Sequence, residues 1–140
     1  MPSSILVVDD EADLELLVRH NFRQRITSGE LAFLFAANGE EALGLLQAHP
    51  EIELVVTDIN MPVMDGLTLL AHISELDRLL KVVIVSAYDD LDNIRTAMNR
   101  GAYDFLTKPI DFADVEKTID KTLRDLVNLR EGIAARARLA

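Results

Sequence analysis

Residues 54–66 read LVVTDINMPVMDG, and this stretch decides the fold class. It opens with a short apolar run, Leu54 to Thr57, that is rich in β-branched residues, as in a strand buried on both faces. Asp58 follows this run directly, so its carboxylate would emerge at the carboxyl end of the strand. Gly66 then begins a segment, to about Leu76, in which apolar residues recur with helical spacing. A buried strand followed by an amphipathic helix is the repeating unit of an α/β protein with a parallel sheet.

The same unit repeats on both sides of this stretch. Further short apolar runs predict strands at Ile5 to Val8, about Ala32 to Ala36, Val82 to Val85 and about Tyr103 to Leu106. Segments of helical period predict helices at Ala12 to about Arg25, Glu40 to Ala48, Leu91 to Arg100 and from Phe112 onward. The apolar face of the first helix would be formed by Leu14, Leu17, Val18 and Phe22. We therefore expect five βα units.

Composition limits the size, location and partners of the protein. A chain of 140 residues with 49% apolar residues fits one domain with a single core. The net charge of −10 would repel nucleic-acid phosphates, so no direct nucleic-acid binding is expected. Because there is no cysteine, disulfides and thiolate metal sites are excluded, and a cytoplasmic location fits best. The N-terminus lacks the pattern of a signal peptide, and charges interrupt every apolar run, so we expect no membrane association.

Three carboxylates would meet at one edge of the predicted sheet. Asp9 and Asp10 follow the first strand directly, and Asp58 follows the third, which is its neighbour in the strand order 2-1-3-4-5. Like charges in contact raise one another's pKa values, so a cation is needed to keep all three ionised. Oxygen ligands favour Mg²⁺ over Zn²⁺. Taken alone, Asp9 and Asp10 also fit a helix N-terminus, where the helix dipole favours acidic residues.

A hydroxyl and an ammonium group would join these carboxylates. Ser86 closes the fourth predicted strand, and Lys108 follows the fifth, just before Pro109. A transferred phosphoryl group needs a hydrogen-bond donor and a balancing positive charge on its oxygens. Either residue by itself would carry little information, but both follow successive strands beside the acidic cluster. The five groups together predict one phosphoryl site.

Four segments resemble the receiver domain of response regulators in two-component signalling, over about residues 4–125. The segments are Asp9-Asp10, DINMPVMDG around Asp58, Ser86-Ala87 and Lys108-Pro109. The resemblance implies a doubly wound (βα)5, flavodoxin-like three-layer sandwich with sheet order 2-1-3-4-5. It also implies a signalling switch, not an enzyme with its own substrate. Such a protein accepts a phosphoryl group from a sensor histidine kinase or phosphotransfer protein and then controls a downstream effector domain or protein.

The resemblance also assigns roles to the acidic residues and to Asn60. Asp58 would be the phosphoacceptor, and Asp10 and Asp58 would be direct Mg²⁺ ligands, with Mn²⁺ able to substitute. The backbone carbonyl of Asn60 would be the third protein ligand, and Asp9 would act through a water. Asn60 also lies where the family tunes the lifetime of the phosphoryl group.

Further roles fall on the residues that follow the last two strands. Ser86 and Lys108 would hold the phosphoryl oxygens, and the Lys108-Pro109 peptide is expected to be cis. Phe105 would be a rotameric switch coupled to Ser86. Because Phe105 has no hydroxyl, we expect burial alone to favour its inward position; the alternative is an ordinary core phenylalanine. Tyr88, like Asn60, would tune the phosphoryl lifetime by screening the attacking water.

The C-terminal segment is longer than a small domain needs. No proline interrupts it from Phe112 to the chain end, about 29 residues, which as a continuous helix would measure roughly 43 Å. Apolar residues recur at alternating four- and three-residue steps, with Arg130 as an interruption: Ile119, Leu123, Leu126, Arg130, Ile133, Ala137 and Ala140. We expect a receiver domain over residues 1–125 and a helical extension over 126–140. The extension would be either a coiled-coil linker, to a homodimer partner or an output domain, or a solvated tail.

Two other classes of function are disfavoured. A phosphatase of the haloacid dehalogenase kind also combines an aspartyl nucleophile with Mg²⁺ and lysine, but it needs a second aspartate two residues after the nucleophile as general acid. Asn60 stands at that position, and an amide cannot act as that acid. An interaction module that works without phosphorylation would not require the complete set of acidic, hydroxyl and lysine residues.

Overall fold

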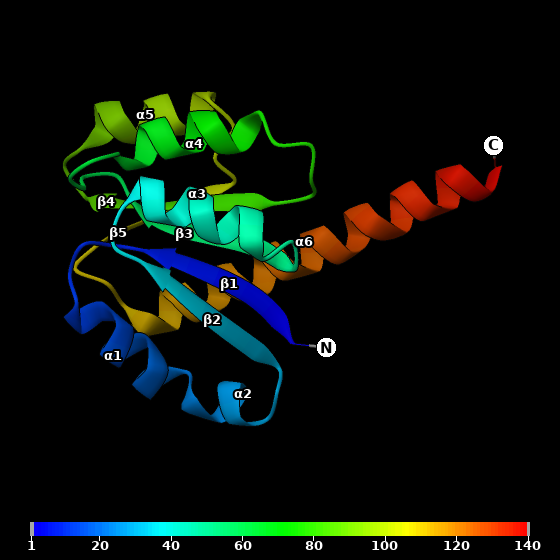
Figure 1. The fold of residues 1–140 in the computed structure, drawn as a ribbon, viewed down its shortest axis with the longest axis horizontal. Coiled ribbons are helices and arrows are strands. Elements are labelled where there is room, and N and C mark those ends of the chain that lie inside the picture. Colours follow the sequence, from blue (N-terminus) through cyan, green and yellow to red (C-terminus); the bar gives the residue numbers. More distant parts are fainter. Residues whose placement is uncertain (1, 140) are drawn as a thin grey trace.

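The computed structural model describes residues 2–139 and contains a five-stranded parallel sheet (Figure 1). The strands are β1 (Ser3–Val8), β2 (Leu31–Ala36), β3 (Ile52–Asp58), β4 (Lys81–Ala87) and β5 (Asp104–Lys108). They lie in the order β2-β1-β3-β4-β5, which confirms the predicted order. Strands β1, β3 and β4 are almost wholly buried, as their continuous apolar runs predicted.

Helices cover both faces of the sheet, so the predicted three-layer, doubly wound fold is confirmed (Figure 1). The helices are α1 (Asp13–Asn21), α2 (Arg23–Thr27), α3 (Gly39–Ala48), α4 (Gly66–Ser74), α5 (Leu91–Asn99) and α6 (Phe112–Leu139). Helices α3, α4 and α5 bury residues such as Leu46 and Leu70 on one face of the sheet. Helices α1 and α6 bury Val18 and Ile119 on the other. Two apolar layers therefore hold the sheet rigid between them.

Three strands extend further toward their carboxyl ends than the apolar runs predicted. Strand β3 includes Asp58, β4 includes Ala87, and β5 runs to Lys108 instead of ending at Leu106. Backbone pairing causes the extension, since Asp58 lies opposite Val85 and Ala87 opposite Lys108. A run of apolar residues marks only the apolar part of a strand, whereas the hydrogen-bonded ladder continues into polar residues such as Asp58 and Ser86. Asp58, Ser86 and Lys108 therefore lie on the strands themselves, whereas Asp9 and Asp10 follow β1 directly.

The first predicted helix is two helices in the structure. Phe22, with φ of −108°, separates α1 from α2 and places its ring in the core with Phe33 and Phe112. Val18 is buried one helical turn before it, whereas Leu17 is 48% exposed. The prediction that Leu17 faces the core was wrong. The nine-residue α1 contacts the sheet only through residues that are four apart in the sequence, and Leu17 is not one of them.

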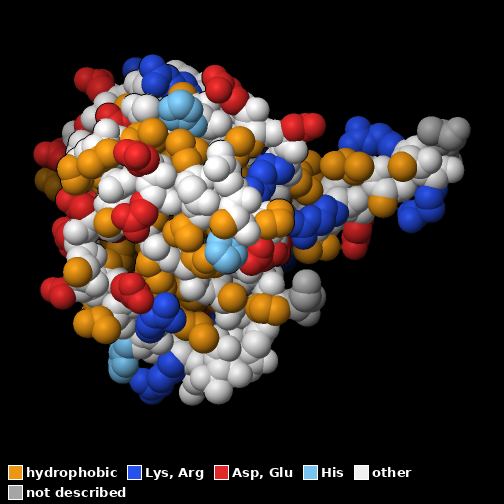
Figure 2. All heavy atoms as spheres, viewed as in Figure 1, with side chains coloured by type: hydrophobic (Ala, Val, Ile, Leu, Met, Phe, Trp, Pro, Cys, Tyr) orange, Lys and Arg blue, Asp and Glu red, His pale blue; other side chains and the backbone are white. Residues whose placement is uncertain are grey.

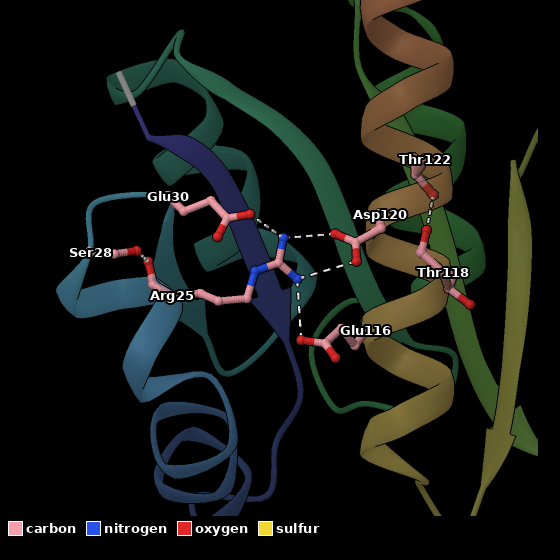
Figure 3. A network of polar contacts seen from close by, with 7 residues as sticks. All are labelled: Arg25, Ser28, Glu30, Glu116, Thr118, Asp120 and Thr122. Carbon is pink, nitrogen blue, oxygen red and sulfur yellow. Dashed lines mark hydrogen bonds and ion pairs between the residues drawn. The ribbon is translucent and has the colours of Figure 1, made fainter.

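A guanidinium group ties α2 to α6 (Figure 3). Arg25 donates to Asp120 Oδ1 at 2.7 Å and Oδ2 at 3.3 Å, and to Glu30 Oε1 at 2.7 Å. It also lies 3.3 Å from Glu116 Oε2. These bonds raise the pKa of Arg25, the hydrogen bond with Glu30 contributing most. The network fixes the polar segment before β2 against the first third of α6.

Helix α6 extends well beyond the body of the domain (Figure 1). Leu126 is fully buried, and Arg130 forms an ion pair with Glu53 at 2.9 Å, whereas Ile133 is exposed. Figure 2 shows basic side chains on the projecting end of α6 and acidic side chains along the opposite edge of the body. That acidic edge is the carboxyl edge of the sheet in the same view. Within residues 2–139, none of the helices combines the length and the apolar character that a membrane span requires.

Candidate functional site

The ends of β1 and β3 bring three carboxylates together. Val8 lies opposite Thr57 in the sheet, so the residues after Val8 and after Thr57 emerge side by side. One carboxylate oxygen from each of Asp9, Asp10 and Asp58 falls within 4.8 Å of the others. Such a set of oxygen donors fits a hard divalent cation such as Mg²⁺. The convergence predicted from the strand order is therefore present.

Asp9 and Asp10 do not cap the helix that follows them. Helix α1 begins at Asp13, and its N-cap residue, Ala12, makes no side-chain cap hydrogen bond. Asp9 instead accepts a hydrogen bond from the backbone N–H of Glu11 at 2.8 Å, ahead of the helix. The alternative interpretation of these two residues as a helix N-terminus is therefore not supported by the geometry.

Asp58 is held at both of its carboxylate oxygens. Lys108 Nζ donates to Oδ2 at 2.7 Å, and the backbone N–H of Asn60 donates to Oδ1 at 3.2 Å. The Asp58 side chain is 4% exposed, so these bonds replace most of its solvation. Asp58 is the last residue of β3, so its carboxylate lies at the carboxyl edge of the sheet.

Burial and neighbouring charges together raise the pKa values of Asp9 and Lys108. Burial is the main cause of a raised pKa for Asp9; the Glu11 N–H opposes it, and the charge of Asp58 adds to it. For Lys108, burial alone would lower the pKa, but its hydrogen bond and charge contact with Asp58 raise it on balance. Lys108 Nζ also lies 4.0 Å from Asp9 Oδ2. The three carboxylates at this edge also carry more negative charge than Lys108 balances, and a bound cation would relieve that excess.

Ser86 and Lys108 come from the adjoining strand ends. Asp58 lies opposite Val85, so Ser86 is the next residue along β4, and Ala87 lies opposite Lys108 on β5. Ser86 is 1% exposed, and its hydroxyl donates to Asp90 Oδ2 at 3.1 Å. The Lys108-Pro109 peptide is cis. Asp90 was not predicted from the sequence, although an aspartate four residues after a strand-end serine, directly before a helix, was a usable signal.

The aromatic residues near the site are both turned outward. Phe105 is 42% exposed and Tyr88 is 73% exposed. The expectation that burial keeps the Phe105 ring inward is wrong for this structure. Strand β5 is the edge of the sheet, and its burial alternates so that Phe105 and Thr107 share the less covered face. The roles of Phe105 as a switch and of Tyr88 and Asn60 in tuning stay predictions.

The loop after Asp58 is held by close backbone contacts that sequence reasoning did not anticipate. A Cβ on Gly66 would collide with the carbonyl oxygen of Asp58 and lie 2.8 Å from the Cα of Ile59. The N–H of Gly66 donates to the Ile59 carbonyl at 2.8 Å. Gly66 is therefore required for close approach to the end of β3, not for flexibility. Only the three-dimensional path of the loop shows this requirement.

Comparison with known sequences places the chain in a family. The response regulator receiver domain family matches residues 5–120. The chain therefore belongs to the response regulator receiver domains, which are signalling switches of two-component systems. A curated relative, the transcriptional regulatory protein HptR of Staphylococcus aureus, is 36% identical over 126 residues. That match covers 88% of this chain but only 47% of the relative, so the chain spans about half the length of such relatives.

Solved structures agree with this assignment. The signal receiver domain of an HD domain-containing protein from Pseudomonas fluorescens superposes with a TM-score of 0.80 at 28% identity, covering 93% of both chains. The CheX–CheY–BeF3–Mg complex from Borrelia burgdorferi matches with a TM-score of 0.73 at 33% identity, covering 88% of this chain and 90% of that one. The fold and the family are thus established by independent comparisons.

Proposed function

We propose that Asp58 accepts a phosphoryl group from a phosphohistidine of a sensor kinase or phosphotransfer protein. The observation that carries this proposal is the ring of groups around its carboxylate. Asp9 and Asp10 lie beside it, and the Lys108 ammonium contacts it at 2.7 Å. Nucleophile, metal-ligand set and counter-charge thus share one edge of the sheet.

The residues at this edge suit a resident Mg²⁺, with Mn²⁺ as a substitute. Asp10 and Asp58 would be direct ligands, the backbone carbonyl of Asn60 a third, and Asp9 would contribute through a water. All are oxygen donors, and burial, with a smaller contribution from the charge of Asp58, raises the pKa of Asp9. When bound, the cation supplies positive charge that neutralises the acidic residues and the phosphoryl oxygens. A relative that is 33% identical is described in complex with BeF3 and Mg, which supports this choice.

The chain's own residues account for the transfer step. A carboxylate oxygen of Asp58 attacks phosphorus in line as the phosphorus–nitrogen bond breaks, and the electron pair leaves with the imidazole. Lys108 moves its hydrogen bond from Asp58 to the phosphoryl oxygens, where negative charge remains. The Ser86 hydroxyl donates to another oxygen. The product is an acyl phosphate that water hydrolyses, with Tyr88 and Asn60 setting the access of that water.

Phosphorylation would then change the contacts of the domain with an output partner. New hydrogen bonds from Ser86 and Lys108 favour a second arrangement of the surface formed by α5, β5 and α6. Phe105, half-exposed on β5, would turn inward in that state. Curated relatives that are about twice as long are named transcriptional regulators, so the output is a separate domain or protein. The cytoplasmic location expected from the sequence stays part of this proposal.

Intact mass after incubation with acetyl phosphate tests the function. With Mg²⁺, the protein should gain one phosphoryl group, and Asp58→Asn should gain none. Asp65→Asn is a matched control in the same loop, since Asp65 only accepts the helix-capping bond from Thr68 N–H at 2.8 Å. This control should gain the group as the wild type does. Phosphoryl uptake that persists in Asp58→Asn, or that does not need Mg²⁺, would refute the proposal.

A further inference from the structure

The hydroxyl of Ser86 is already engaged in the unphosphorylated structure. Ser86 is buried, and its Oγ donates to Asp90 Oδ2 at 3.1 Å. A serine hydroxyl has a single proton to donate. The proton that the phosphoryl group needs is therefore committed to a carboxylate four residues further along the chain.

Asp90 keeps its position without help from Ser86. Its two carboxylate oxygens accept from Asn93 Nδ2 at 3.1 and 3.0 Å. Its backbone N–H donates to the Ala87 carbonyl at 3.0 Å, and its own carbonyl accepts from Ile94 N–H at 3.1 Å. Release of the serine would leave the Asp90 carboxylate with a partner and the start of α5 in place. The bond to Ser86 is thus one that the protein is able to give up.

The Asp90 carboxylate is also not occupied as a helix cap. Asp90 is the N-cap residue of α5, yet its side chain makes no cap hydrogen bond to a helix N–H. Aspartate at this position ordinarily accepts such a bond. By contrast, Asn38 and Asp65 cap α3 and α4 through their side chains. At α5 the side chain is turned toward Ser86 and Asn93 instead.

We propose that Asp90 is a positioning residue that holds the Ser86 hydroxyl away from the phosphoryl oxygens in the resting state. The inference rests on the proposed function, since it requires a phosphoryl group at Asp58. Two anionic acceptors then compete for one donor. A hydrogen bond to a charged acceptor is roughly twice as strong as one to a neutral acceptor. Asp90 therefore lowers the affinity of the site for the phosphoryl group. Its charge sets how often the Ser86 hydroxyl is bound to Asp90 and how often to the phosphoryl oxygens.

Binding of beryllofluoride in the presence of Mg²⁺, measured by titration calorimetry on the full chain, tests this competition. Asp90→Asn keeps the size and an amide that caps helices but removes the charge. Its affinity for beryllofluoride should rise about fivefold, the factor for roughly 1 kcal/mol of weakened hydrogen bond. Asp89→Asn removes the same charge from the neighbouring, exposed residue and should change the affinity less than twofold. Asp90→Ser serves as a second variant and should also bind more tightly than the wild type.

A double-mutant cycle with Ser86→Ala separates a hydrogen-bond effect from a general charge effect. If Asp90 acts through the serine hydroxyl, Asp90→Asn should have no effect in the Ser86→Ala background. The same fivefold gain in both backgrounds, or no gain in the wild-type background, would overturn the proposal for Asp90. Neither result would affect the role of Asp58. Absence of beryllofluoride binding by the wild type would instead overturn the proposed function, and this inference with it.

Discussion

Val63 adopts a backbone conformation that valine rarely tolerates. Its φ is 69°, and Met64 N–H donates to the Pro62 carbonyl at 2.7 Å across it. A three-residue turn with positive φ is strained for any residue with a Cβ, and more so for a β-branched one. The Met64 carbonyl accepts from Gly39 N–H at 3.2 Å, which anchors the turn to the start of α3. The strained residue lies between Asp58 and Gly66, in the loop that follows the proposed phosphoacceptor.

Replacing Val63 by glycine should therefore stabilise the protein. Relief of the strain exceeds the entropy that glycine adds to the unfolded chain, so the free energy of unfolding should rise by about 1 kcal/mol. Urea denaturation measures the change. Val63→Ala is the matched control, because it removes the β-branch but keeps the Cβ, and it should gain less. A glycine variant less stable than the wild type would contradict this reading of the turn.

The residues of the candidate site were predictable from the sequence, whereas the backbone strain and the hydrogen bond that surround them were not. Asp9, Asp58 and Lys108 directly follow or end apolar runs, so strand order alone brings them together. The strain at Val63 and the Ser86–Asp90 bond depend on backbone paths that carry no compositional signal. Only the folded backbone brings these groups together.

At the scale of elements, Tyr103 joins the start of β5 to α6. Its hydroxyl donates to Asp125, and the ammonium groups of Lys81 and Lys121 lie 5.3 and 5.2 Å from the centre of its ring. Burial, and then the hydrogen bond to Asp125, raise the pKa of Tyr103 to about 12. The contact fastens the edge strand to the helix that leads out of the domain.

This contact predicts a loss of stability at high pH. The folded state holds the Tyr103 proton more tightly than the unfolded chain, whose pKa is near 10. The stabilisation is complete below pH 10 and falls as the pH rises from 10 toward 12. The difference in unfolding free energy between wild type and Tyr103→Phe should therefore shrink over that range in urea titrations. Asp125→Asn, which keeps an acceptor without its charge, should show a shallower fall. A constant difference between wild type and Tyr103→Phe would refute the coupling.

The order and type of the elements followed from hydrophobic period, but their ends did not. The apolar stripe continues through Phe22 at helical spacing, which predicted a single helix from Ala12 to about Arg25. In the structure Phe22 ends α1, and its ring enters the core between β2 and α6. Tertiary packing at one aromatic residue thus outweighed local periodicity.

For the whole molecule, the projecting part of α6 is the feature that its receiver fold does not require. Leu129 and Ile133 are exposed, and they follow Leu126, the last fully buried residue of the described chain, at steps of three and four residues. We propose that this face pairs with a second copy of the chain. Exposed apolar residues at three- and four-residue steps are typical of a helix that pairs with another helix. An output domain that follows the helix, or a solvated end, is the alternative.

Light scattering distinguishes these cases. Ile133→Glu should convert a dimer to a monomer, because it places a charge in the middle of the apolar face. Ala134→Glu adds the same charge to the next residue, off that face, and should leave the dimer intact. Identical monomer masses for the wild type and both variants would rule out pairing through α6.

The overhang of α6 also works as a lever. From Leu126 to Leu139 the helix measures about 20 Å, so a tilt of about 10° at the domain would displace its far end by about 3 Å. Two polar contacts hold α6 to the body on either side of Leu126: Asp120 binds Arg25, and Arg130 binds Glu53. A tilt of the projecting part would therefore be centred on this stretch of the helix. A small movement at the strand ends, if it tilts α6, would thus be enlarged at the tip of the helix. Any domain or partner joined to the tip would be displaced by about the length of one atomic contact.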